Sequence, residues 1–150
     1  MPRFQFRYQT LLDQRCRAEQ QAQRDLADIM GQQQNLQEQL TGTQHKITRG
    51  KQDLRESLTG RVDLSSVAQF GRYNSHSLID GQRLVGRLAQ LQPHIDAARR
   101  RLNNATRERK ALQHLHDKDL ADWKRTQRLR ENNALDEAAI QMHMAARAAS

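Results

Sequence analysis

Aromatic residues, prolines and cysteines are all scarce in this sequence of 150 residues. Aromatics make up 4%, there are two prolines and one cysteine, and only 36% of the residues are hydrophobic. The mean hydropathy of −0.97 leaves too little apolar material for a thick globular core. Gln, Arg, Leu and Ala dominate instead, a composition typical of long helices and coiled coils. Disorder is the competing interpretation, and the periodicity of the apolar residues decides between the two.

Long apolar runs are also missing. No stretch approaches the roughly 18 apolar residues needed to span a bilayer, and the N-terminus alternates charged and aromatic residues instead of forming the apolar segment of a signal peptide. We therefore expect a cytoplasmic protein. The single cysteine, Cys16, excludes an internal disulfide framework and fits a reducing compartment.

Motifs for catalysis and for metal binding are absent. The sequence has no glycine-rich phosphate loop, no nucleophile motif and no paired cysteines. His114 and His116 are two residues apart, which places them on different faces of a helix and argues against a zinc site. The sequence predicts no enzyme, no cofactor and no metal.

The charge is uneven along the chain. The formal net charge is +8, residues 99–130 carry eleven Lys and Arg against four Asp and Glu, and residues 131–150 carry one against three. The basic stretch is a candidate contact surface for an acidic protein groove, a nucleic acid or an anionic membrane, among which charge alone does not choose.

Two apolar stripes repeat every 3.5 residues, the period of a left-handed coiled coil. The first stripe comprises Tyr8, Leu12, Arg15, Glu19, Ala22, Leu26, Ile29, Gln33, Leu36, Leu40, Thr43, Ile47, Gly50 and Leu54. The second stripe comprises Val67, Phe70, Asn74, Ser77, Gly81, Leu84, Leu88, Leu91, Ile95, Ala98, Leu102, Ala105, Arg109, Leu112 and His116. The fold class we predict is all-α, a long antiparallel two-helix coiled-coil hairpin.

The register of this hairpin follows from the numbering. Every pair of residues whose numbers sum to 124 joins one stripe to the other, for example Leu40 with Leu84 and Leu12 with Leu112. We expect a single domain over 1–150, with helix 1 over about 4–58, a turn over about 59–66 and helix 2 over about 66–143. Pro93 predicts a kink in helix 2, with a break into two helices as the alternative.

The half of the hairpin nearest the turn is expected to be the less stable half. Six of the seven glycines fall between positions 42 and 86, and each interior glycine destabilises a helix by roughly 0.5–1 kcal/mol relative to alanine. Exposed Phe70, Tyr73 and Leu78 beside them are candidates for a docking surface, although a loosely wound tip without a function explains them equally well.

The second helix is predicted to outrun the first. Phe4 falls near Leu120 in this register, so about twenty residues beyond it have no partner in the chain, including Trp123 and Leu129. Trp123 is either an anchor for a partner or a residue that packs against Pro2 and Phe4. Arg15 and Arg109 share one layer and are expected to turn outward and pair with the neighbouring Glu19 and Glu108.

Beyond this period, the order of residues resembles the flagellar export protein FliJ. The similarity is carried by Phe4-Gln-Phe-Arg-Tyr-Gln-Thr-Leu-Leu-Asp-Gln-Arg, Arg17-Ala-Glu-Gln-Gln-Ala, Ala105-Thr-Arg-Glu-Arg-Lys-Ala-Leu-Gln-His-Leu, Trp123 and Leu135-Asp-Glu-Ala-Ala. It covers most of the chain. Here Gly71, Gly81 and Gly86 interrupt the aromatic and leucine residues that the family presents after the turn.

The resemblance implies a non-catalytic, stalk-like component of the flagellar type III export apparatus, peripherally associated with the cytoplasmic side of the membrane. Its partners would be a hexameric export ATPase, the cytoplasmic domain of the export-gate membrane protein, and export chaperones. The ATPase-binding candidates are Phe6, Leu11, Arg15, Arg107, Lys110, Trp123 and Asp136, and the gate-binding candidates are Phe70, Tyr73 and Leu78. The alternatives are the homologous stalk of a virulence secretion system, a basic nucleic-acid-binding coiled coil, and a generic scaffold.

Overall fold

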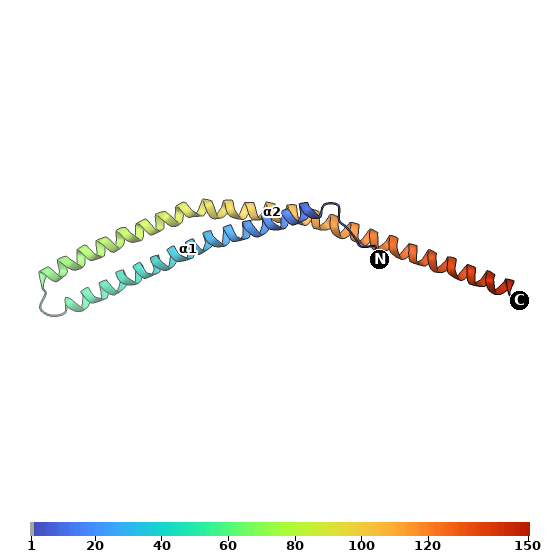
Figure 1. The fold of residues 1–150 in the computed structure, drawn as a ribbon. Coiled ribbons are helices and arrows are strands. Elements are labelled where there is room, and N and C mark those ends of the chain that lie inside the picture. Colours follow the sequence, from blue (N-terminus) through green and yellow to red (C-terminus); the bar gives the residue numbers. More distant parts are fainter. Residues whose placement is uncertain (1) are drawn as a thin grey trace. The chain divides into compact units, whose positions relative to one another are not determined.

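The computed structural model describes residues 2–150, which form two helices joined by one turn (Figure 1). Helix α1 spans Gln9–Ser57 and helix α2 spans Leu64–Ala148, with 49 and 85 residues. The described residues contain no strand. The predicted all-α helical hairpin is confirmed. Neither helix has a segment apolar enough to cross a membrane.

The packing divides the chain into two compact units. The turn unit is Gln20–Asn103, and the terminal unit combines the segment up to Glu19 with Asn104–Ser150. Each unit is described by itself below. The expectation of a single domain stays a prediction.

The turn of the hairpin is built by one glycine and one aspartate. Gly60 has a φ of 138°, a conformation that glycine adopts without the steric cost that a Cβ would bring. Asp63 precedes α2 as its N-cap: its Oδ1 accepts hydrogen bonds from the Ser65 backbone N–H at 3.1 Å and from the Ser65 hydroxyl at 2.9 Å. The Ser65 hydroxyl, the Ser65 backbone N–H and the Ser66 hydroxyl together hold the pKa of the Asp63 carboxyl below its usual value.

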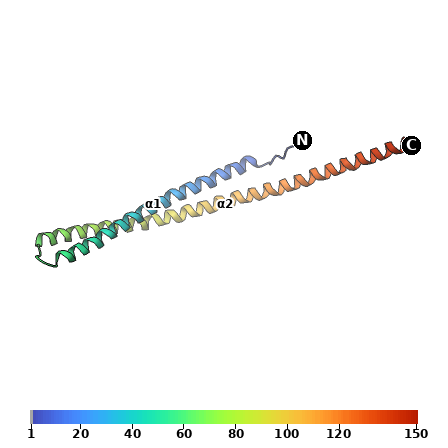
Figure 2. The ribbon, with the colours of Figure 1, turned by 90° about the horizontal axis from the view of Figure 1, so that it is seen from below.

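In the turn unit the two helices lie side by side and bury the residues that the second stripe predicted (Figures 1 and 2). Ile95 and Ala98 are each only 1% exposed, and Leu84 is also buried. The methyl group of Thr43 lies 3.7 Å from the position that a Cβ on Gly81 would occupy, as expected for two residues that share a layer. The predicted register is therefore found at this layer.

The layers nearest the turn pack differently from those around Ile95. Ser77 is the buried polar residue among residues 2–150, and the buried Oδ1 of Asn74 has no hydrogen-bond partner in the described chain. Gly50 accommodates the ring of Phe70, whose Cε2 lies 2.8 Å from where a Cβ would stand on residue 50. Phe70 therefore covers a glycine that no larger residue could replace without a shift of the ring.

The predicted helix boundaries need three corrections. Helix α1 begins at Gln9 rather than near Phe4, because the preceding segment leaves the helical path to place its aromatic rings against α2. The turn is shorter than 59–66, since the Asp63 cap starts α2 at Leu64, and α2 continues past 143 to Ala148.

Pro93 does not break α2, which runs through it without interruption, so the alternative of two separate helices is wrong. Pro93 and Ala89 are both exposed. The Ala89 carbonyl, which loses its usual N–H partner at Pro93, can therefore be hydrated by solvent, which lowers the cost of an interior proline. The predicted kink stays a prediction.

Candidate protein-binding surfaces

An aromatic cluster fastens the N-terminal segment to α2 in the terminal unit. The ring of His116 lies between two phenylalanines, with centroid distances of 5.1 Å to Phe6 and 5.5 Å to Phe4, both edge to face. Phe4 also lies 6.0 Å from Trp123. The predicted register pairs His116 with Tyr8, because their numbers sum to 124; in the structure Phe6, only 7% exposed, contacts the His116 ring, and the Tyr8 ring lies 5.9 Å from that of Phe6.

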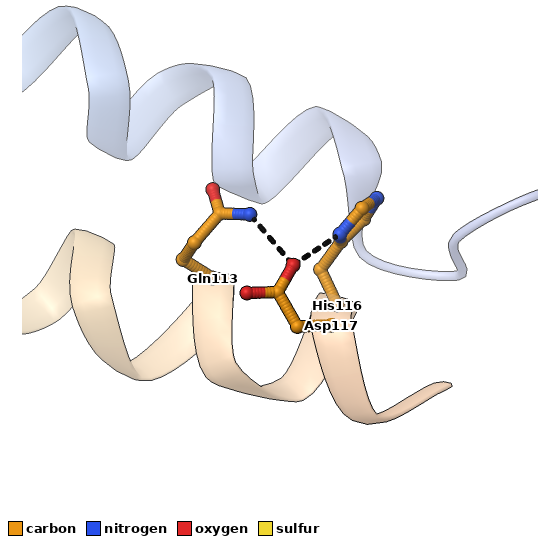
Figure 3. Close-up of polar contacts among 3 residues, drawn as sticks. All are labelled: Gln113, His116 and Asp117. Atoms are coloured by element: carbon orange, nitrogen blue, oxygen red, sulfur yellow. Dashed lines mark hydrogen bonds and ion pairs between the residues drawn. The ribbon is translucent and has the colours of Figure 1, made fainter. Parts of the chain in front are cut away.

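A short polar network holds the His116 ring in place (Figure 3). Asp117 Oδ1 lies 3.1 Å from His116 Nδ1 and accepts a hydrogen bond from Gln113 Nε2, also at 3.1 Å. The hydrogen bond with His116, reinforced by the one from Gln113, holds the pKa of the Asp117 carboxyl below its usual value. An ionised Asp117 therefore orients the imidazole that the two phenylalanine rings contact.

Two crossed ion pairs flank the next layer, as predicted. Arg15 donates to Glu108 at 2.6 Å, and Arg109 donates to Glu19. The Arg109 pair is the more enclosed of the two, with side chains 27% and 14% exposed. Both arginines thus avoid facing each other in the apolar layer, and the pairs fix the register of α1 on α2 in this unit.

The end of α2 extends beyond the N-terminal segment and has no covering element in its unit (Figure 1). We call residues 128–150 the overhang, because every side chain in this range is exposed. Its large apolar side chains are Leu129, Leu135, Ile140, Met142 and Met144, each more than half exposed. Trp123 does not belong to the overhang, because it is partly covered by Phe4. The alternative that packs Trp123 against Pro2 and Phe4 is therefore the one that the structure supports.

The seven predicted ATPase-binding residues fall into three groups, all in the terminal unit. Phe6 and Trp123 belong to the aromatic cluster, joined through Phe4. Arg15 is held in its ion pair, and Leu11 is 38% exposed. Arg107, Lys110 and Asp136 are exposed, Asp136 on the overhang.

The three predicted gate-binding residues lie on α2 in the turn unit. Tyr73 and Leu78 are 51% and 47% exposed, whereas Phe70 is partly covered where it packs on Gly50. Leu78 lines an apolar groove of about 310 Å³ between the two helices. The other lining residues are Leu40, Thr43, Gln44, Ile47, Gly81, Gln82 and Val85. This groove opens where the small residues Thr43 and Gly81 leave space between the helices.

A second groove, which the sequence interpretation missed, lies on α2 in the terminal unit. It has a volume of about 610 Å³ and is lined by Asp117, Leu120, Ala121, Lys124, Arg125, Arg128, Leu129 and Asn132. The clustered Lys and Arg in residues 99–130 hinted at it, but only the helical geometry shows that three of these cations share one face with Ala121 and Leu120.

Among residues 2–150, no group of three or more His, Cys, Asp and Glu side chains is placed to hold a metal ion. The described chain is a helical hairpin with shallow grooves on its surface and an uncovered end of α2.

The family is shown by comparison with known proteins. The family model described as "Flagellar FliJ protein" matches residues 4–148, nearly the whole chain. The protein belongs to the FliJ family, whose members are non-enzymatic components of the flagellar export apparatus. No curated protein and no solved structure matches the chain.

Proposed function

We propose that this protein is the stalk-like component that binds the hexameric export ATPase through its terminal unit. The observation that carries the proposal is the overhang, in which α2 continues from residue 128 to Ala148 with every side chain exposed. Five large apolar side chains in this segment face solvent. A helix with such a surface is stabilised when a partner covers it.

In this proposal some of the predicted contact residues bind the ATPase directly and others act indirectly. Leu11, Arg107, Lys110 and Asp136 are exposed and meet the ATPase directly. Trp123 contributes its uncovered side to the same surface. Phe6 is buried against His116 and holds the N-terminal segment in position, so its effect on binding is indirect.

The turn unit supplies a second contact in this proposal. Tyr73 and Leu78 are exposed on α2, and Leu78 borders the apolar groove between the helices. These residues, with Phe70, bind the cytoplasmic domain of the export-gate protein. Handling of export chaperones and a location on the cytoplasmic side of the cell membrane complete the proposed role.

The test uses purified protein and the export ATPase encoded in the same genome. Isothermal titration should give saturable binding, and the variant Leu135→Asp/Met142→Asp should weaken it strongly, because charge then replaces two apolar side chains that are 68% and 74% exposed. The matched variant Tyr73→Asp, in the turn unit, should bind the ATPase normally and lose affinity for the gate domain. Equal loss of ATPase binding by both variants would sink the assignment of surfaces.

The second groove, on α2 in the terminal unit, is called the basic groove from here on, since Lys124, Arg125 and Arg128 line it together. It favours a second candidate function, nucleic-acid binding. No aromatic side chain lines the groove to stack a base. Binding to DNA that disappears near about 150 mM salt would mark this attraction as nonspecific, whereas sequence-dependent binding that persists would favour this second candidate.

A further inference from the structure

The basic groove is formed by one helix alone. All eight residues that line its volume of about 610 Å³ belong to α2. Beside it, in the N-terminal segment, Phe4 and Phe6 contact His116 and Phe4 contacts Trp123. Pro2 borders a shallow hollow that it shares with Lys124, Arg128 and Glu131. Asp117, Ala121 and Lys124 are all exposed next to this segment, so the face that bears them can receive another helix.

The same face continues along the overhang with a heptad spacing. Alternating steps of four and three residues place one stripe on it, which we call the α2 outer stripe: Asp117, Ala121, Lys124, Arg128, Glu131, Leu135, Ala138, Met142 and Ala145. The first four positions lie in the groove or on its edge, and the later ones are mainly apolar. Leu135 and Met142 are 68% and 74% exposed, so no part of the described chain covers them.

This stripe is complementary to itself when a second copy runs antiparallel. From Asp117 to Met142, pairs whose residue numbers sum to 259 join stripe positions: Asp117 with Met142, Ala121 with Ala138, Lys124 with Leu135, and Arg128 with Glu131. The two-fold axis falls between residues 129 and 130. In this arrangement Leu135 of each copy enters the groove of the other, against Ala121 and the aliphatic stem of Lys124.

The charges at the centre agree with this arrangement. Arg128 of one copy faces Glu131 of the other, and the two-fold axis generates this pair twice. Within the described chain neither side chain forms an ion pair, since the four pairs present involve other residues. The wider charge distribution also favours this pairing. Residues 99–130 are basic and residues 131–150 are acidic, so an antiparallel arrangement places the basic part of one copy beside the acidic part of the other.

We infer that this protein self-associates as an antiparallel dimer through the α2 outer stripe, with the overhang of each copy seated in the basic groove of the other. The paired stripe positions run from residue 117 to residue 142, between three and four heptads. The polar central layers make this a reversible dimer that fixes its register through charge. Any other partner of the overhang then competes with the second copy.

The test is sedimentation equilibrium of the full chain over a wide range of concentrations. The wild type should change reversibly from 17.4 kDa toward twice that mass. The variants Arg128→Glu and Glu131→Arg should each weaken the dimer about tenfold or more, because four like charges then meet at the axis. Mixing the two variants should restore the dimer, because one copy then carries two acidic and the other two basic residues at the axis.

Two matched variants control for charge alone. Arg130→Glu and Glu137→Arg make the same changes about 200° and 240° around the helix from Arg128 and Glu131, and both should dimerise as the wild type does. A wild type that stays monomeric at every concentration, an Arg130→Glu variant that loses the dimer as Arg128→Glu does, or a mixture that stays monomeric would each overturn the proposal. The measurement involves no ATPase, so its failure is distinct from failure of the proposed function.

Discussion

Trp123 is in contact with the N-terminal segment on one side and with solvent on the other. We expect Trp123→Ala to weaken ATPase binding by about 1–3 kcal/mol, since a large aromatic at the edge of an interface is an effective anchor. Phe4→Ala removes the same ring contact while it leaves the exposed side of Trp123 in place. Both variants should lower the melting temperature by a similar amount, and Phe4→Ala should cause the smaller loss of affinity for the ATPase. Equal effects of both variants on affinity would show that Trp123 acts only by holding the N-terminal segment.

The cap of α2 predicts a dependence of stability on pH. Hydrogen bonds from Ser65 and Ser66 hold the pKa of Asp63 below its usual value of 3.8. Because the folded-state pKa is the lower one, the ionised carboxyl stabilises the fold above the unfolded pKa, and this contribution is lost as the pH falls through the folded pKa.

Asp63→Ala should therefore lower the melting temperature at neutral pH, and its difference from the wild type should shrink below about pH 4. Thermal unfolding followed by circular dichroism at several pH values checks this. Asp28→Ala, on an exposed face of α1, serves as the control and should show no such loss. A constant difference for Asp63→Ala across the whole pH range would contradict the role of the charge.

At the scale of the element, the glycines of α1 differ in what surrounds them. A Cβ on Gly42 would meet nothing within 4 Å, whereas a Cβ on Gly50 would meet the Phe70 ring at 2.8 Å. Gly42→Ala should raise the free energy of unfolding by about 0.5–1 kcal/mol through helix propensity. Gly50→Ala should gain less or lose stability, because the Phe70 ring must move. Chemical denaturation of both variants decides the matter, and an equal gain would contradict the close contact.

The layers near the turn should also open more readily than those around Ile95. The layers near the turn contain Ser77, the unpaired Asn74 oxygen and interior glycines. The other layers of the turn unit contain the buried apolar residues Leu84, Ile95 and Ala98. Hydrogen exchange should be faster over residues 42–81 than over 22–40 and 84–102. Uniform protection would show that the glycine-rich layers are as stable as the leucine-rich ones.

Much of this arrangement could be predicted from sequence because heptad packing repeats. The spacing of Leu84, Ile95 and Ala98 fixed which face is buried, and the glycine at 60 marked the turn. The burial of Phe6 could not be predicted in this way, because it results from a non-helical segment folding back on His116 and follows no period. The basic groove was missed for a related reason: its cations were counted along the chain and not placed around the helix.

At the scale of the whole molecule, the overhang is expected to contribute to partner binding but not to the stability of the fold. A chain ending at Gln127 lacks only exposed side chains, and it keeps the aromatic cluster, both crossed ion pairs and the buried layers of the turn unit. At protein concentrations at which the full chain is monomeric, the thermal unfolding of the two chains should therefore barely differ.

Binding is expected to respond in the opposite way. The truncated chain should lose most of its affinity for the export ATPase, because the uncovered apolar side chains from Leu129 to Met144 are gone, and it should keep its affinity for the gate domain through Tyr73 and Leu78. A chain ending at Gln141 removes Met142 and Met144 but keeps Leu129, Leu135 and Ile140, and it should be intermediate. Titration of all three chains against both partners tests this. If the chain ending at Gln127 still binds the ATPase as the full chain does, the ATPase surface lies in Leu11, Arg107 and Lys110, and the overhang serves another partner.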